Sequence, residues 1–273
     1  MTSYGIAWPT PWKDGGLTGR DSFVANQDLL ATMADALTGN GKRPVLRCDF
    51  DTRETPEARD VAFEAAIRVG LDLVVIIALG ERKQKFPKCW RGKVPAASIN
   101  EVATLAARLD ARRPRPRLVE VGNEPSGLDV STFIRYVKAV QQQYHGSVGV
   151  SVGEKANFAS GHFDFGDRVH AACPETVSVL HPYRDDPFAV IPDYAELKQR
   201  FGRLAVTEFN QPLTAVLGEA SQALAIKREI NAAREHVELF IAYSHHSGLA
   251  DDPWALWING EPRPTVAVLS EAT

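Results

Sequence analysis

The chain has 273 residues, which is more than an average domain contains and close to the roughly 250 that one closed α/β barrel requires. Hydrophobic residues make up 44% of the sequence and charged residues 24%, a composition that excludes disordered, collagen-like and fibrous proteins. The formal net charge of −3 supplies no basic field for nucleic acid or anionic lipid, so we expect neither as a partner.

No targeting or membrane signal is evident in the sequence. The amino terminus has neither the basic segment nor the apolar core of a secretory signal, and the longest apolar run, residues 71–79, is too short to cross a membrane. The location therefore stays open between the cytoplasm and release by a non-classical route or by phage lysis. Three cysteines without CxxC or Cys/His spacing argue against a disulfide framework or a zinc site and fit a reducing compartment.

Short β-branched apolar runs alternate along the chain with longer stretches whose apolar residues recur at helical spacing. We predict strands at residues 4–8, 44–49, 71–79, 117–122, 147–152, 176–181, 203–208 and 237–244. We predict helices at 21–38, 56–69, 98–109, 129–144, 165–173, 193–201, 219–235 and 264–272. Eight such units without a linker-like stretch favour an α/β fold with a single domain, residues 1–273, built as a (β/α)₈ barrel with short loops.

Local signals at the helix starts support this alternation. Ser98 and Glu101 have the spacing of a capping box, and Asp129 is placed to cap the helix that follows it. The main alternative is a doubly wound open sheet, which requires a glycine-rich phosphate turn after its first strand. Residues 7–12 read Ala-Trp-Pro-Thr-Pro-Trp and contain no glycine, so we favour the barrel.

Two of the predicted strands end in glutamate. Glu124 follows the fourth strand and Glu208 ends the seventh, and these strands face each other across the mouth of a barrel. Barrel enzymes carry their catalytic residues at the carboxyl ends of the strands. A pair of carboxylates across a pocket is what glycoside cleavage requires, because one protonates the leaving oxygen while the other attacks the sugar carbon or activates water.

Four short motifs give these glutamates a family context. They are Asn-Glu-Pro at 123–125, Thr-Glu at 207–208, His-Pro-Tyr at 181–183, and Arg47 on the second strand. Together they resemble the clan A glycoside hydrolases, retaining (β/α)₈ enzymes that include many cellulases, mannanases and xylan-degrading enzymes. The resemblance spans all eight units.

The resemblance implies a role for each matching residue. Glu124 is expected to be the acid/base and Glu208 the nucleophile. Asn123 is expected to hydrogen-bond the 2-hydroxyl of the sugar, and Tyr183 to hold the carboxylate of the nucleophile. Arg47 is expected to help keep that carboxylate ionised.

The sequence departs from the family at the end of the eighth strand. Many family members place a tryptophan there as the floor of a sugar subsite, whereas this strand ends in Tyr-Ser-His-His at 243–246. We expect Tyr243 or His245 to take its place. Trp8 is a further candidate for stacking on a sugar, with simple packing as the alternative, and His181 is expected to form a hydrogen-bonded wall rather than to donate a proton.

Three other features have competing interpretations. Glu120 points to the same side of its strand as Glu124 and is either a third site acid or, as we favour, a structural carboxylate satisfied by Arg47 or another buried partner. The neighbouring His245 and His246 would lie on opposite strand faces, so we expect no metal. The basic loop at 80–95 is either solvated or a rim that contacts an anionic glycan.

The sequence thus favours a monomeric retaining glycoside hydrolase that cleaves a β-linked oligo- or polysaccharide by double displacement and needs no cofactor. A transglycosylase using the same residues is a close variant. A non-catalytic carbohydrate-binding barrel is the alternative from another class, and a metal-dependent barrel hydrolase ranks third. The sugar, the linkage and endo or exo action stay open.

Overall fold

A computed structural model describes residues 2–7, 27–38, 43–51, 56–79, 82–83, 93–184, 186, 189–211, 218–243, 246–247, 255–258 and 261–272. Eight parallel strands form a closed barrel in the order β1-β10-β9-β8-β7-β6-β3-β2. The strands are β1 (Ser3–Ala7), β2 (Val45–Asp51), β3 (Asp72–Ala78), β6 (Leu118–Val121), β7 (Ser147–Gly153), β8 (Val177–Leu180), β9 (Leu204–Phe209) and β10 (Val237–Tyr243). The predicted (β/α)₈ fold is therefore confirmed.

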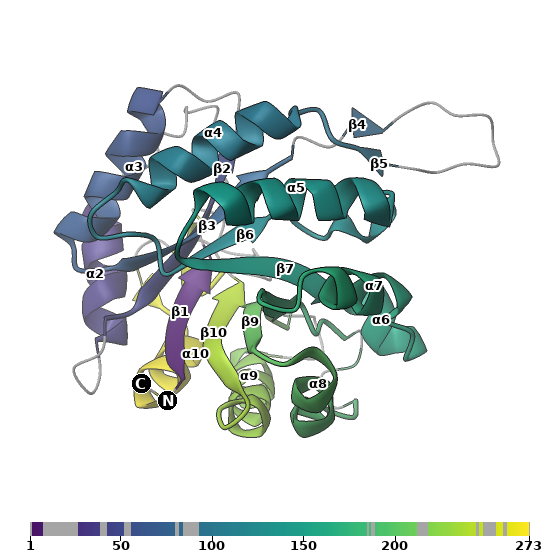
Figure 1. Ribbon diagram of the computed structural model, residues 1–273. Coiled ribbons are helices and arrows are strands. Elements are labelled where there is room, and N and C mark those ends of the chain that lie inside the picture. The colour runs from purple at the N-terminus through teal and green to yellow at the C-terminus, as the bar shows by residue number, and fades with distance from the viewer. Residues whose placement is uncertain are drawn as a thin grey trace.

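Helices surround the barrel (Figure 1). They are α2 (Gln27–Leu37), α3 (Pro56–Arg68), α4 (Ile99–Asp110), α5 (Val130–Gln143), α7 (Asp164–Ala172), α8 (Tyr194–Phe201), α9 (Glu219–Ala233) and α10 (Pro264–Ala272). Both predicted caps are present: Ser98 and Glu101 form a capping box on α4, and the Asp129 side chain accepts from the backbone N–H of Thr132 at the start of α5.

Burial of the strands on both faces explains why each strand is a nearly continuous run of apolar residues in the sequence. Strands of a parallel barrel are covered on both faces, by the barrel interior on one side and by the helices on the other. Side chains such as Val45, Val74 and Leu118 form the inner cluster, and the larger outer cluster fills the space beneath the helices. Trp257 belongs to the outer cluster and is fully buried.

The first and last units close the barrel against each other. β1 pairs in parallel with both β2 and β10, and the Thr2 hydroxyl donates to the carbonyl of Val237 at 2.7 Å. Helix α10 packs against β1, α2 and α9 (Figure 1). None of the helices in the described ranges is long and apolar enough to span a membrane.

Short elements follow several strands at their carboxyl ends. Strands β4 (Arg82–Lys83) and β5 (Lys93–Val94) pair after β3, and a 3₁₀ turn, η1 (Pro125–Gly127), follows β6. Helix α6 (Lys155–Ser160) follows β7. Strands β11 (His246–Ser247), β12 (Trp257–Ile258) and β13 (Glu261–Pro262) form a small sheet between β10 and α10. The side chains of the candidate site come from this end of the barrel.

Candidate active site

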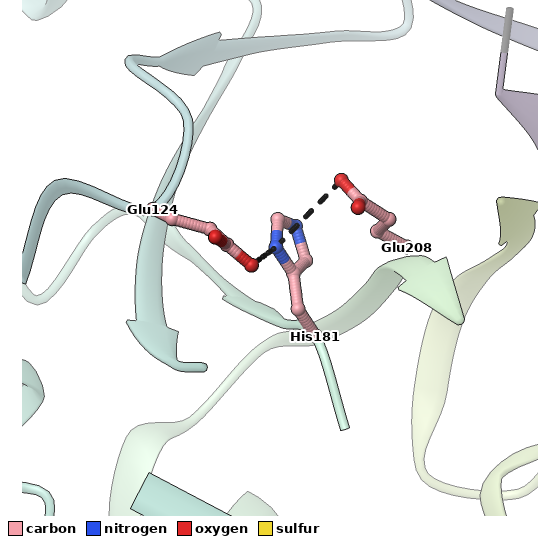
Figure 2. A group of neighbouring side chains, drawn as sticks. All are labelled: Glu124, His181 and Glu208. Carbon is pink, nitrogen blue, oxygen red and sulfur yellow. Dashed lines mark hydrogen bonds and ion pairs between the residues drawn. The ribbon is translucent and has the colours of Figure 1, made fainter. Parts of the chain in front are cut away.

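The two predicted glutamates meet at the carboxyl end of the barrel, with His181 between them (Figure 2). One carboxylate oxygen of Glu124, one of Glu208 and a ring nitrogen of His181 all lie within 4.8 Å of one another. The Glu124 side chain is 39% exposed, whereas that of Glu208 is 11% exposed. The site therefore combines one carboxyl group that solvent reaches with one that is nearly enclosed.

Two donors hold the carboxylate of Glu208 in place. Nη1 of Arg47 donates to Oε2 at 2.9 Å, and the hydroxyl of Tyr183 donates to Oε1 at 2.9 Å. Arg47 lies on β2, and Tyr183 follows β8, the strand next to β9. Each carboxylate oxygen thus has its own donor, one of them charged, and such bonds favour the ionised form.

Arg47 is buried and connects three acceptors. Its Nε and Nη2 donate to the two carboxylate oxygens of Glu120 at 3.0 and 2.9 Å, and Nη2 also donates to Oδ1 of Asn123 at 3.0 Å. These bonds identify Arg47 as the buried partner of Glu120. Burial acts against the charge of Arg47, but Glu120 and Glu208 outweigh it and raise the pKa of the guanidinium.

Strand β7 leaves room for the Glu120 side chain. Gly149 on β7 pairs with Glu120 on β6, and a Cβ atom at Gly149 would lie 3.1 Å from Cγ of Glu120. That distance is shorter than ordinary van der Waals contact. The glycine at this register therefore allows the buried ion pair to form.

The donors around His181 determine where its proton lies. Nη2 of Arg47 approaches Nε2 at 3.4 Å, and a guanidinium has no acceptor, so Nε2 accepts. The hydroxyl of Thr207 lies 3.2 Å from the same nitrogen. The neutral ring then carries its proton on Nδ1, which lies 3.3 Å from Oε1 of Glu124 and 3.8 Å from Oε2 of Glu208. His181 is fully buried, and its ring nitrogens lie within reach of Arg47, Thr207 and Glu124.

Two tyrosines lie together beside the nucleophile candidate. The rings of Tyr183 and Tyr243 make an edge contact at 6.3 Å, which places Tyr243 at the site end of β10. Burial, followed by the charge of Glu208, raises the pKa of Tyr183 well above its usual value, so its hydroxyl stays protonated and able to donate. The other two predicted substrate-binding residues, Trp8 and His245, lie outside the described residues.

Glu154, which directly follows β7, is a residue of the site that was not predicted from the sequence. It lines a cavity of about 350 Å³ together with Glu124, Lys155, Ala156 and Ala159. Its carboxylate accepts from the backbone N–H of Ser126 at 3.0 Å and from the hydroxyl of Ser126 at 2.6 Å. The position of Glu154 at a strand end is the signal that could have identified it, since the same rule identified Glu124 and Glu208.

The close approach of Glu124, His181 and Glu208 also meets the distance requirement for a metal site. Within the described ranges, Glu124, His181 and Glu208 form the group that meets this distance requirement. The Arg47 guanidinium donates directly to Glu208 and places a positive charge beside the group, which opposes a cation there. The donor set suits proton transfer and nucleophilic attack better than metal binding.

Comparisons with known proteins define the fold but not the family. No model of a protein family matches the sequence, and no curated protein matches it. Many solved structures are similar to the chain, and three of them illustrate how low the sequence identity is. The GH30 endoxylanase from Clostridium papyrosolvens C71 has a TM-score of 0.62 and 12% identity over 99% of this chain and 71% of that one.

The other two structures cover both chains almost fully. The GH128 (subgroup I) endo-β-1,3-glucanase from Amycolatopsis mediterranei in complex with laminaritriose has a TM-score of 0.57 and 17% identity, and it covers 100% of both chains. The GH113 β-mannanase from Alicyclobacillus acidocaldarius in complex with ManMIm has a TM-score of 0.58 and 13% identity over 99% and 95% of the two chains. At the level of fold, the resemblance to the clan A glycoside hydrolases is confirmed.

Proposed function

We propose that the protein is a retaining glycoside hydrolase that cleaves a β-linked glycan by double displacement. The observation that carries this proposal is the approach of a Glu124 oxygen and a Glu208 oxygen to within 4.8 Å at the carboxyl end of the barrel. Retaining enzymes keep their two carboxyl groups about 5 to 5.5 Å apart, whereas inverting enzymes need about 6.5 to 9.5 Å to admit a water molecule. The 4.8 Å limit applies to one oxygen of each carboxyl group, and so close an approach supports direct attack by one carboxylate.

The environment of Glu208 suits a nucleophile. A nucleophilic carboxylate has to be ionised in a site that substrate binding empties of water, and burial alone would disfavour that charge. Arg47 and Tyr183 supply one donor to each oxygen of Glu208. Both donors lie within 3 Å of the oxygens they bind, so the charge is stabilised before the substrate arrives.

The environment of Glu124 suits an acid/base. Its side chain is the more exposed of the pair and lines an open cavity, so a leaving group and later a water molecule can reach it. The proton on Nδ1 of His181 points to Glu124 and stabilises the carboxylate form that this residue takes after giving up its own proton. The two glutamates therefore have different surroundings, as acid and nucleophile require.

The proposed reaction proceeds in two displacements. Glu208 attacks the anomeric carbon as the bond to the leaving oxygen breaks, and Glu124 gives that oxygen its proton, which leaves a sugar ester on Glu208. Glu124, now a carboxylate, then removes a proton from water as the water oxygen attacks the same carbon, and Glu208 leaves as a carboxylate. A sugar hydroxyl in place of this water would give transglycosylation.

Two further residues are proposed to bind the sugar. Arg47 donates a hydrogen bond to Oδ1 of Asn123, and the amide nitrogen of Asn123 is the group that can donate to a sugar hydroxyl. Tyr243 packs edge-on against Tyr183 and is half-buried, which suits a ring that forms one side of a sugar subsite.

The test is an activity screen with matched variants. The wild-type protein would be incubated with aryl β-glycosides and with β-glucans, mannan, xylan, chitosan and peptidoglycan, and the products identified by mass. We expect at least one glycan to be cleaved, Glu208→Ala to abolish turnover, and the exposed control Glu196→Ala to leave it unchanged. Glu124→Ala should retain more activity on an activated aryl glycoside than on a natural glycan, because a good leaving group needs little protonation.

Either of two results would contradict the proposal. Turnover that survives Glu208→Ala would remove the nucleophile assignment. Saturable binding of a glycan by the wild-type protein without cleavage of any member of the panel would support a carbohydrate-binding barrel instead.

A further inference from the structure

The backbone at Glu124 has an uncommon conformation that contacts with neighbouring residues must stabilise. Its φ of 47° and ψ of 61° place Glu124 in the left-handed region. Among the described residues, Glu124 is the one residue other than glycine that has a positive φ. For residues other than glycine this region costs about 1 to 2 kcal/mol. Such a conformation persists where neighbouring contacts over-determine it.

Glu154 makes the contact that holds this segment. The turn η1 begins directly after Glu124, and the Glu124 side chain does not cap it. Instead, Glu154 accepts from both the backbone N–H and the hydroxyl of Ser126, the second residue of η1, at 3.0 and 2.6 Å. A carboxylate bonded to a backbone N–H is among the stronger hydrogen bonds in proteins, so this pair resists movement of the turn.

Glu154 is itself anchored on the neighbouring strand. β6 and β7 pair in parallel, so the segments after them leave the barrel side by side. The backbone N–H of Glu154 donates to Oδ1 of Asn157 at 2.8 Å, and the amide nitrogen of Asn157 donates to the carbonyl of His162 at 2.7 Å. The carboxylate of Glu154, which binds Ser126 of η1, is thus attached to a backbone segment that hydrogen bonds hold in place.

We propose that Glu154 is a positioning residue for Glu124, in that its hydrogen bonds to Ser126 fix the turn η1 and thereby the left-handed backbone that presents the Glu124 carboxyl to the leaving group. The inference rests on the proposed function, in which Glu124 is the acid/base. A displacement of that carboxyl by about 1 Å would be expected to cost on the order of 10²-fold in rate.

The charge of Glu154 also acts on Glu124. Burial raises the pKa of Glu154, the two bonds from Ser126 oppose that rise, and the negative charge of Glu124 adds to it. This electrostatic interaction is mutual, so an ionised Glu154 helps Glu124 to keep its proton until the leaving group takes it. Among the described residues, other groups near Glu124 include His181, which follows β8, Glu208 on β9 and Lys155 on α6.

Three variants separate the hydrogen bonds from the charge. Glu154→Gln keeps an oxygen that can accept from the Ser126 N–H but removes the charge. Ser126→Ala removes the hydroxyl bond and keeps both the charge and the backbone bond. Glu154→Ala removes all of these, and Glu196→Gln, an exposed glutamate on α8, is the control for the loss of one negative charge.

Each variant would be measured in two ways. The first is kcat and KM as a function of pH. The second is a ¹³C NMR titration of the side-chain carboxyl groups, with the Glu124 signal identified by its loss in Glu124→Gln. The titration requires no substrate, so it tests the positioning of Glu124 even if every glycan in the panel is left uncleaved and the proposed function fails.

We expect Glu154→Ala to lower kcat by about 10²-fold with a smaller change in KM. Glu154→Gln should restore most of kcat while moving the basic limb of the profile and the titration midpoint of Glu124 to lower pH. Ser126→Ala should fall between Glu154→Ala and the wild type, and it keeps the test valid if Glu154→Ala fails to fold. Wild-type kcat in both Glu154→Ala and Ser126→Ala, or a Glu124 midpoint that Glu154→Ala leaves unmoved, would overturn the inference.

Discussion

One guanidinium organises the candidate site at the scale of single residues. Arg47 donates to Glu120, Glu208 and Asn123 from a position that is 3% exposed. Burying one carboxylate without a partner would be costly, and burying two beside each other more so. Arg47 offsets both charges with bonds of 2.9 to 3.0 Å, which is why the carboxylates can share a small enclosed space.

Tyr183→Phe tests the other donor to Glu208. The substitution removes one hydroxyl that favours the ionised carboxylate, so the acidic limb of the pH profile should move to higher pH. We expect kcat to fall by about 10²- to 10³-fold, the loss found when one well-placed donor is removed from an active site. Steady-state kinetics across pH measure both effects.

Tyr194→Phe is the matched control for that variant. Tyr194 on α8 is also a buried phenol that donates to a glutamate, in its case Glu229 on α9. Its replacement should lower stability without moving the acidic limb. A wild-type profile in Tyr183→Phe, or an equal shift in both variants, would show that another group orients Glu208.

The residue types of the site could be predicted, but several of their contacts could not. Strand ends identified Glu124 and Glu208, and the inward position of Glu120 led to its pairing with Arg47. The contact between Glu154 and Ser126 joins two segments that follow neighbouring strands. No sequence spacing encodes it, because it depends on how far each segment bends after leaving the barrel.

At the scale of elements, the strand pattern was predicted more fully than the short connections. All eight barrel strands were predicted, because burial on both faces gives a run of apolar residues that turn signals interrupt. Helix α6 was not predicted, since residues 155–160 include no buried side chain and too few residues to show a helical period. The start of the helix predicted at 21–38 falls partly outside the described residues, which begin α2 at Gln27.

Gly149→Ala tests the fit between β6 and β7. The added methyl would lie 3.1 Å from Cγ of Glu120 and from Cγ2 of Val179, so Glu120 should shift and pull Arg47 with it. We expect a loss of about 1 to 3 kcal/mol in the free energy of unfolding, measured with urea, and a lower kcat.

Gly218→Ala is the control for this substitution, because its methyl would meet no atom within 4 Å. It should change stability by less than about 1 kcal/mol and leave kcat as it is. If Gly149→Ala behaved in the same way, the space beside Glu120 would not be needed for the ion pair.

At the scale of the whole molecule, the ends of the described chain meet. β1 pairs with β10, and α10 covers β1 together with α2 and α9. The residues of the candidate site lie on β2, β9 and β10 or directly after β6 and β8, so the geometry of the site requires that the barrel be closed. That residues 1–273 form one domain remains a prediction.

Leu269→Ala tests how much the last helix contributes to barrel closure. Leu269 is fully buried on α10, whereas its neighbour Val268 is partly buried. We expect Leu269→Ala to lower the free energy of unfolding by about 2 to 5 kcal/mol, and Val268→Ala by clearly less. Near- and far-UV circular dichroism should report the same shifted urea transition if the chain unfolds as one unit. Separate transitions would contradict the single domain.

The stereochemistry of the first product tests the central claim most directly. With a β-linked substrate found by the screen, ¹H NMR in the first minutes of hydrolysis identifies the anomer released before mutarotation mixes the two forms. Double displacement by Glu124 and Glu208 predicts the β anomer, because two inversions restore the original configuration. Initial release of the α anomer would contradict the account, since it would require a water molecule where one oxygen of each carboxylate lies within 4.8 Å of the other.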